Sequence, residues 1–157
     1  MKLVPVNKGK YFALVDDEDY DLASQCTWTA LDQRRRGRKS LYAYTGYRVG
    51  DKKVRNSLHR LLMGNPPGEV DHVNRNGLDC QRHNMRVATH GGNMSNVPAR
   101  NRSGLKGAYR NPDGSWKACI RARNRSYHLG TFRSAQAAHA AYCQAALKHH
   151  GEFAGLS

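Results

Sequence analysis

A polar loop set between two short predicted strands constrains the fold of this chain more than any other feature. Residues 69–73 and 85–88 are predicted to be strands, and residues 74–83 between them a loop. Thr89 follows the second strand directly and is predicted to cap the N-terminus of a helix. The glycine pair 91–92 opposes that helix by roughly 1 kcal/mol per glycine relative to alanine. The sequence therefore predicts the order strand, loop, strand, helix in this region.

Four polar residues stand at fixed spacing in this region. Asp71 precedes His72, Asn84 comes twelve residues after that histidine, and Asn93 nine residues further on. Hydrolysis of a phosphodiester needs a base that activates water and a cation on the scissile phosphate. A neutral imidazole is a suitable base near neutral pH, and carboxylate and amide oxygens suit Mg²⁺. Neighbouring side chains on a strand diverge, so Asp71 and His72 border one site only if the helix packs across the strand end.

The charge of the chain predicts a polyanionic partner. The formal net charge is +14 over 157 residues, which favours nucleic acid first and an anionic membrane second. Residues 34–55 hold nine Lys or Arg opposed only by Asp51, and residues 100–133 hold nine more opposed only by Asp113. Two basic blocks that flank residues 71–72 are the arrangement expected if both ends grip a duplex. The basic run 34–39 is predicted to be a hairpin loop, either solvated or in contact with phosphate.

Several protein classes are excluded by composition. No run of about twenty apolar residues exists to span a bilayer, and the N-terminus lacks the apolar run of a signal peptide. We therefore expect a soluble, cytoplasmic protein that makes no membrane contact. No two cysteines form a C-x-x-C pair, so a zinc ribbon or a redox motif is not expected, and the cysteines are predicted to be reduced. They are Cys26, Cys80, Cys119 and Cys143.

The rest of the chain predicts an α+β fold. Before the polar loop we expect a small β region, with strands at residues 11–15, near Trp28 and at 41–45, and a short helix at 58–63. After it we expect three antiparallel strands and one helix capped by Ser134. Those strands are residues 108–110, 116–123 and 126–132, and the helix buries a stripe of Ala138, Ala141, Tyr142 and Ala145.

The middle of the chain resembles HNH endonucleases of the phage and homing-endonuclease type, over roughly residues 58–96. The motifs that carry the resemblance are Leu-His-Arg at 58–60, Val-Asp-His at 70–72, the run 84–89 and Asn93. The resemblance implies a ββα-metal core with His72 as general base and Asn84 fixing the loop. It also implies that Asp71 and Asn93 bind Mg²⁺, for which Mn²⁺ or another divalent cation can substitute.

The last third, residues 104–154, is similar to the DNA-binding domain of plant ethylene-response factors (the Apetala type). The matching motifs are residues 116–121, 129–132 and 137–142. The resemblance implies a three-stranded sheet that lies in the major groove. Cys119 and His128 replace the glutamate and tryptophan usual in that family, so the target sequence does not carry over. The DNA-contacting residues predicted for the whole chain are Arg86, Arg100, Arg102, Tyr109, Arg110, Lys117, Arg121, Arg123, Arg125 and His128.

Taken together, these features predict a nuclease domain at 1–97, a basic linker at 98–104 and a DNA-binding domain at 105–157. The predicted activity is metal-dependent cleavage of double-stranded DNA, with nicking of one strand expected, that leaves 5′-phosphate and 3′-hydroxyl ends. We expect a monomer or weak homodimer with no obligate protein partner. The alternatives are a catalytically inactive DNA-binding regulator and an RNA-binding or RNA-cutting protein. Arg86 either clamps a phosphate or is solvated, and a core role is favoured for His59.

Overall fold

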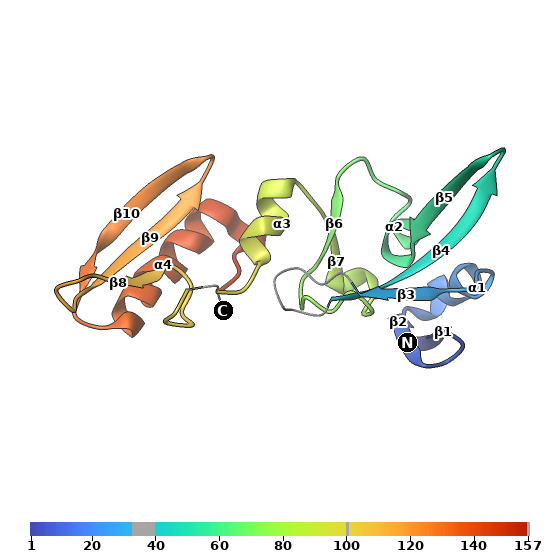
Figure 1. The fold of residues 1–157 in the computed structure, drawn as a ribbon, viewed down its shortest axis with the longest axis horizontal. Helices are drawn as coiled ribbons and strands as arrows, with labels where there is room; N and C mark the ends of the chain where they lie inside the picture. The colour runs from blue at the N-terminus through green and yellow to red at the C-terminus, as the bar shows by residue number, and fades with distance from the viewer. Residues whose placement is uncertain (33–39, 100, 157) are drawn as a thin grey trace. The chain divides into compact units, whose positions relative to one another are not determined.

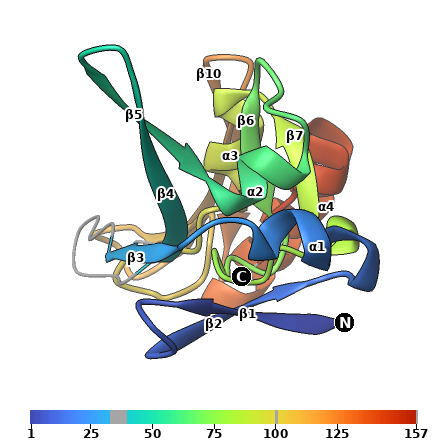
Figure 2. The same cartoon turned by 90° about the vertical axis from the view of Figure 1, so that its right-hand side faces the viewer.

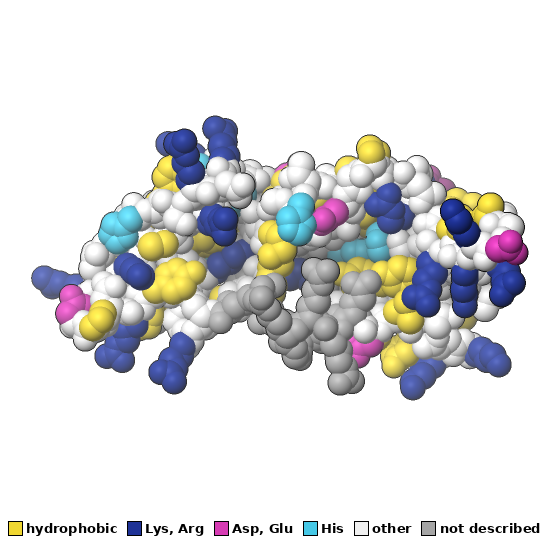
Figure 3. All heavy atoms as spheres, turned by 45° about the horizontal axis from the view of Figure 1, so that its top comes forward, with side chains coloured by type: hydrophobic (Ala, Val, Ile, Leu, Met, Phe, Trp, Pro, Cys, Tyr) yellow, Lys and Arg dark blue, Asp and Glu magenta, His cyan; other side chains and the backbone are white. Residues whose placement is uncertain are grey.

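The chain divides into two compact units, Met1–Ala88 and Thr89–Ser157. The structure, a computed structural model, describes residues 1–32, 40–99 and 101–156. Among these residues, the first unit has three sheets and the second has one (Figure 1). Each unit has its own buried hydrophobic residues. Lysine and arginine side chains stand out from both units with few carboxylates on the face that Figure 3 shows. No helix of the described residues is long and apolar enough to cross a membrane. Helices and antiparallel strands occur together, so the α+β prediction is confirmed.

The first unit contains three small antiparallel sheets, β1-β2, β3-β4-β5 and β6-β7. Their strands are β1 (Lys2–Val6), β2 (Tyr11–Val15), β3 (Thr29–Asp32), β4 (Leu41–Val49), β5 (Lys52–Ser57), β6 (Glu69–His72) and β7 (Met85–Ala88). Four short helical segments connect them: η1 (Asp17–Asp19), α1 (Tyr20–Ser24), α2 (Leu58–Leu62) and η2 (Arg82–Asn84). Figure 2 shows the β1-β2 pair on one side of the unit and α2 beside β6 and β7.

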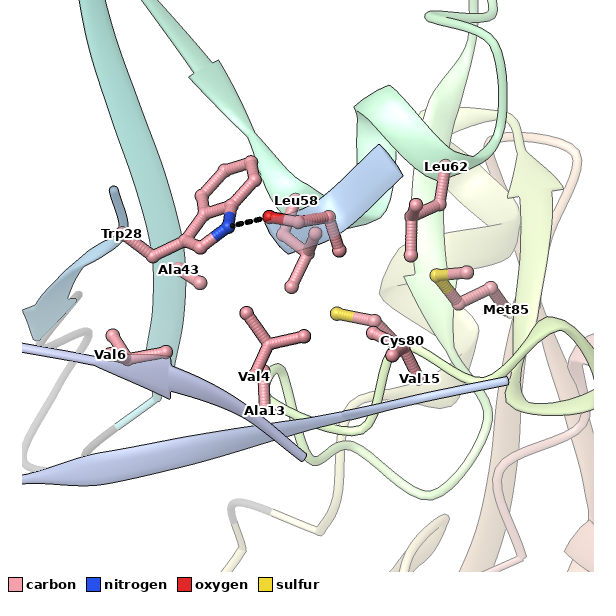
Figure 4. Close-up of a cluster of buried hydrophobic side chains, with 11 residues drawn as sticks. Val4, Val6, Ala13, Val15, Trp28, Ala43, Leu58, Leu62, Cys80 and Met85 are labelled. Atoms are coloured by element: carbon pink, nitrogen blue, oxygen red, sulfur yellow. Dashed lines mark hydrogen bonds between the residues drawn. The ribbon is translucent and has the colours of Figure 1, made fainter. Parts of the chain in front are cut away.

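Alternation along β1 and β2 builds the core of the first unit. Val4 and Val6 of β1 and Ala13 and Val15 of β2 are fully buried, because every second side chain of a strand points to the same face. Trp28 is 1% exposed, and its Nε1 donates a 2.7 Å hydrogen bond to the carbonyl of Ala23, which satisfies the indole inside the core (Figure 4). Leu58, Leu62, Cys80 and Met85 complete the cluster (Figure 4).

The second unit is a three-stranded sheet covered by one long helix. The strand order is β10-β9-β8, and the apolar face of the sheet packs against the helix through Ala138, Tyr142 and Ala146. Ser134 caps this helix by accepting a 3.1 Å hydrogen bond from the amide of Ala137. The elements are α3 (His90–Asn96), β8 (Ala108–Arg110), β9 (Trp116–Ala122), β10 (Arg125–Phe132), α4 (Ala135–His150) and η3 (Gly151–Phe153).

The sequence predictions hold for the second unit and are incomplete for the first. The three strands, the helix, its Ser134 cap and the alternating faces of β9 are confirmed. In the α4 stripe Ala138 and Tyr142 are buried as predicted, Ala141 and Ala145 are partly buried, and Ala146, which was not predicted, is fully buried. In the first unit β1, α1 and β5 were not predicted. Residues 34–39, predicted to be a hairpin loop, lie outside the described residues.

The helix α3 forms although it contains Gly91 and Gly92, which disfavour a helix. Thr89 caps it as predicted, accepting a 3.2 Å hydrogen bond from the amide of Gly92. The chain end packs on this helix, because the amide of Gly155 donates to the carbonyl of Ser95 at 3.2 Å. A Cβ at Gly92 would come within 3.2 Å of the ring of Phe153. Packing against Phe153 therefore explains why residue 92 is a glycine, whereas nothing comparable is found at Gly91 among the described residues. The helix α3 belongs to the second unit. The predicted boundaries at 97 and 104 stay predictions.

Alanine substitutions in α3 test this packing. Gly91→Ala is expected to stabilise the second unit by up to about 1 kcal/mol, because alanine favours helix and its Cβ would meet nothing closer than Thr89 Oγ1 at 3.9 Å. Gly92→Ala is expected to gain less, since the Phe153 ring must shift. Chemical unfolding followed by far-ultraviolet circular dichroism measures both. Equal gains at the two positions would show that the tail does not pack on α3.

Candidate active site on the β6–β7 hairpin

The register of β6 and β7 decides where the predicted site residues point. Asp71 pairs with Arg86 and His72 pairs with Met85. Directly paired residues of an antiparallel ladder share a face, and successive residues alternate. Asp71 and Arg86 therefore lie on one face of the hairpin, and His72 and Met85 lie on the other, toward the core of the first unit. The divergence of Asp71 and His72 expected from the sequence is thus observed.

Asp71 and Arg86 form a largely buried ion pair. Oδ2 of Asp71 accepts hydrogen bonds from Nε and Nη2 of Arg86 at 2.9 and 2.7 Å, and the side chains are only 6% and 13% exposed. Charge-assisted bonds of this kind are strong, and a buried partner left alone would be costly. Of the two alternatives for Arg86, solvation is wrong, because Asp71 on the facing strand carries the opposite charge and pairs with it. Contact of Arg86 with a phosphate stays a prediction. The sequence places opposite charges on two predicted strands, but the register that pairs Asp71 with Arg86 is known only from the fold.

His72 lies inside a cluster of aromatic rings. Its ring is 5.1 Å from that of His59 and 5.7 Å from that of Tyr42, measured between centroids, and the residue is 4% exposed. Nε2 of His72 is 4.0 Å from Sγ of Cys80. Burial lowers the pKa of His72 to about 4, although the carboxylates of Asp71 and Asp79 act in the opposite direction. His72 is therefore neutral at physiological pH, as a general base must be.

His59 of α2 contacts the ring of His72. Its Nε2 and Oγ of Ser57 are 3.0 Å apart and share a hydrogen bond, so the favoured prediction of a core role is confirmed. Burial lowers the pKa of His59 to about 3, and repulsion by His72 when it is protonated and by Arg60 acts in the same direction. Nδ1 of His59 is buried and has no hydrogen-bond partner among the described residues. Two neutral histidines in edge-to-face contact thus form the inner wall of the site.

Asn84 ties the ends of the polar loop together. Its Oδ1 accepts from the amide of Asn74 at 3.0 Å, and its Nδ2 donates to Oδ1 of Asn74 at 3.0 Å and to the carbonyl of Asp79 at 2.8 Å. Its backbone carbonyl accepts from the amide of Val73 at 2.8 Å. Because Val73 directly follows His72, these bonds fix the chain on the C-terminal side of the histidine. The contact with the loop is observed, and a catalytic role for Asn84 stays a prediction.

The loop is also fixed to its surroundings. Leu14 of β2 donates to the carbonyl of Leu78 and accepts from the amide of Cys80, both at 2.8 Å. Gly77 lies against β4, where a Cβ would come within 2.5 Å of the Leu41 carbonyl and the Tyr42 ring. The same Tyr42 ring contacts both histidines. Only glycine fits at this contact, so residue 77 couples the loop to the aromatic wall. The sequence analysis missed Tyr42, whose role follows from the tertiary fold.

The metal ligands proposed from the sequence lie in different units. Asp71 is in the first unit, and Asn93 lies in α3 of the second. Among the described residues, no group of three or more His, Cys, Asp or Glu side chains could hold a metal ion. Mg²⁺ does not need such a group, since one or two protein oxygens, water and substrate phosphate complete its shell. The carboxylate of Asp71 is the kind of oxygen ligand that Mg²⁺ prefers. In the structure this carboxylate is paired with Arg86. The pairing of Asp71 with Asn93 stays a prediction.

The predicted DNA-contacting residues of the second unit do not all lie on one face of its sheet. The face that α4 leaves uncovered carries Tyr109, Lys117, Arg121 and His128, since Lys117 pairs with Tyr109 and His128 with Cys119. Sγ of Cys119 lies 3.9 Å from Nδ1 of His128. The others are placed elsewhere: Arg110 and Arg125 pair with residues of the opposite face, Arg123 lies in a turn, Arg102 is exposed before β8, and Arg100 lies outside the described residues.

Comparison with known proteins adds no family assignment: no family model matches the chain, and no curated protein matches it. The two resemblances read from the sequence motifs therefore stay predictions.

Loss of the Asn84 side chain should destabilise the first unit. Asn84→Ala removes three side-chain hydrogen bonds, one of them to the buried carbonyl of Asp79 and two, partly buried, to Asn74, so we expect a loss of about 2–4 kcal/mol. Unfolding in urea, followed by Trp28 fluorescence in a Trp116→Phe background, reports on this unit. Asn76→Ala is the control, because Asn76 is exposed and accepts one bond from Leu78; a similar loss in both variants would contradict the role of Asn84.

The buried histidines should make the first unit sensitive to acid. Both have a lowered pKa when folded, so below their ordinary value of 6.5 the unfolded chain binds more protons than the folded one. Stability is therefore complete above pH 6.5 and falls as pH drops toward about 4, by about 2–3 kcal/mol per pH unit for two protons. Urea midpoints between pH 6.5 and 5 measure this slope. His59→Gln should halve it, and a flat wild-type profile would contradict the burial.

Proposed function

We propose that the chain is a divalent-metal-dependent DNA endonuclease whose reacting residues lie on the β6–β7 hairpin. The observation that supports this most directly is the fixed, neutral imidazole of His72 at the end of β6. Asn84 holds the backbone next to it, and Tyr42 and His59 hold its ring. A general base needs a single orientation and an unprotonated nitrogen, and both follow from this environment.

In the proposed reaction, a ring nitrogen of His72 accepts the proton of the water that attacks phosphorus. Asp71 supplies a carboxylate oxygen as a cation ligand, with Asn93 as the second ligand that the resemblance implies. A divalent cation, when bound, supplies positive charge at the scissile phosphate and the leaving 3′ oxygen. Arg86 holds the Asp71 carboxylate in place through two hydrogen bonds. The products carry 5′-phosphate and 3′-hydroxyl ends. One such site per chain nicks one strand, and a double-strand break needs a second copy or a second event.

The second unit supports DNA as the substrate. Its uncovered sheet face presents Lys117 and Arg121 beside Tyr109 and His128, and these side chains are exposed. A cationic sheet face of this kind fits the phosphates and base edges of a duplex groove. We propose that this face supplies the sequence preference.

A catalytically inactive DNA-binding regulator is the second candidate. Two observations favour it: His72 is 4% exposed, and the carboxylate of Asp71 already pairs with Arg86. A protein of this kind keeps the DNA-binding sheet and uses the β6–β7 hairpin only as a structural element.

Cleavage of supercoiled plasmid separates the two candidates. Wild type is expected to convert supercoiled to open circular DNA with Mg²⁺ and not with EDTA. His72→Ala should lower the rate at least about 100-fold, the usual contribution of a general base, while duplex binding in a gel shift remains. His83→Ala is the control, since His83 is exposed on the same hairpin. Binding without cleavage under any divalent cation would favour the regulator, and normal cleavage by His72→Ala would refute the base assignment.

A further inference from the structure

The outer half of the β4–β5 hairpin extends beyond the sheet that carries it. β3 pairs with β4 only from Leu41 to Tyr44, so from Thr45 onward β4 and β5 form a two-stranded ribbon. Residues 46–53 are all exposed, and Figures 1 and 2 both show the tip standing clear of the other elements of the first unit. A two-stranded ribbon is marginally stable in water. Core packing therefore does not account for this part of the chain.

The register gives the ribbon one cationic face. Arg48 pairs with Lys53 and Gly46 pairs with Arg55, so the three cations share a face, with the bare backbone of Gly46 between them. A Cβ at Gly46 would lie 3.8 Å from Cε of Lys53, which places the lysine stem along this face. Like charges directly opposite each other destabilise a hairpin. A polyanion bound on this face would remove that repulsion.

A hollow of about 590 Å³ continues the cationic face toward the base of the ribbon. Tyr44, Gly46, Lys53 and Arg55 line it from the ribbon, and Thr27 and Thr29 are among the residues that line the other side. Hydroxyl groups of threonine and tyrosine donate to phosphate oxygens, as lysine and arginine do. No carboxylate lines the hollow among the described residues. Charge and hydrogen-bond donors in this hollow therefore suit an anion.

We propose that the cationic trough, meaning the ribbon face with Arg48, Lys53 and Arg55 and the hollow below it, binds the sugar–phosphate backbone of duplex DNA. The proposal rests on DNA as the partner in the proposed function, and it places a second DNA contact in the unit that holds His72. A membrane is disfavoured, because the apolar side chains Tyr47 and Val54 lie on the opposite face. Single strands are disfavoured, since Tyr44 is the one aromatic ring lining the hollow among the described residues.

The salt dependence of duplex binding tests the trough. The full chain is titrated with duplex DNA in EDTA, so that no cleavage occurs, over a range of salt concentrations. Lys53→Gln/Arg55→Gln is expected to lower the slope of log affinity against log salt by about 2, since each phosphate contact contributes about 0.9. Between 50 and 200 mM salt, the fall in affinity should thus shrink by about tenfold relative to wild type. The charge-matched control is Lys10→Gln/Lys52→Gln, exposed lysines outside the trough.

The outcomes separate the trough from the nuclease proposal. A lower slope in the trough variant alone supports the trough, including when wild type binds DNA and never nicks it, a result that would overturn only the nuclease. Equal slopes in the trough variant and wild type, or equal reductions in the trough variant and the control, overturn the trough even if nicking is normal. A wild type without affinity for duplex DNA overturns both. Arg48→Gln/Arg55→Gln repeats the test on a second pair, and thermal unfolding checks that each variant folds.

Discussion

The arrangement of the first unit depends on the hydrogen bonds that hold the loop at residues 74–81. Leu14 of β2 pairs with this loop through two 2.8 Å bonds, and Asn84 closes it from the other side with three side-chain bonds. With the loop fixed, Gly77 meets Tyr42, and Tyr42 in turn contacts both His59 and His72. Only Leu78 and Cys80 of this loop pack in the core, so these hydrogen bonds hold the remaining, polar part of the loop. They thereby help to determine where the rings around His72 lie.

The fold was predictable where burial gives the sequence a regular period. β9 alternates between buried and exposed residues, and Thr89 and Ser134 start helices by a local hydrogen bond, so all three could be read from the chain. β5 could not be, because its outer residues are exposed on both faces and leave no alternation to detect. The end of the chain was missed for a different reason. Phe153 packs on Gly92 from far along the sequence, and no local pattern marks such a contact.

The candidate site was predictable in its residues more than in its geometry. Spacing identified Asp71, His72 and Asn84, and alternation predicted that the first two diverge, as they do. Alternation does not say which face of a strand turns to the core. That choice is made by the register with β7, which sets His72 beside the buried Met85 and Asp71 beside Arg86. A two-residue difference in loop length would change the partner of Asp71, and for that reason the ion pair was not foreseen.

Burial has two opposite consequences for His72 as a base. It keeps the imidazole neutral by lowering its pKa to about 4, and it also shields the ring from the water that the base would have to activate. His72 is the last residue of β6, and the bond between Val73 and Asn84 fixes the chain directly after it. Exposing the ring therefore requires a rotation of the His72 side chain rather than a movement of the strand. Moving the ring outward would lose aromatic contacts with Tyr42 and His59, on the order of 0.5–1.5 kcal/mol each. The same motion would restore hydration to a buried polar group, which offsets part of that loss. Under the proposed function, a duplex drives this exposure only to the extent that it binds the protein with the ring uncovered more tightly than the protein with the ring buried.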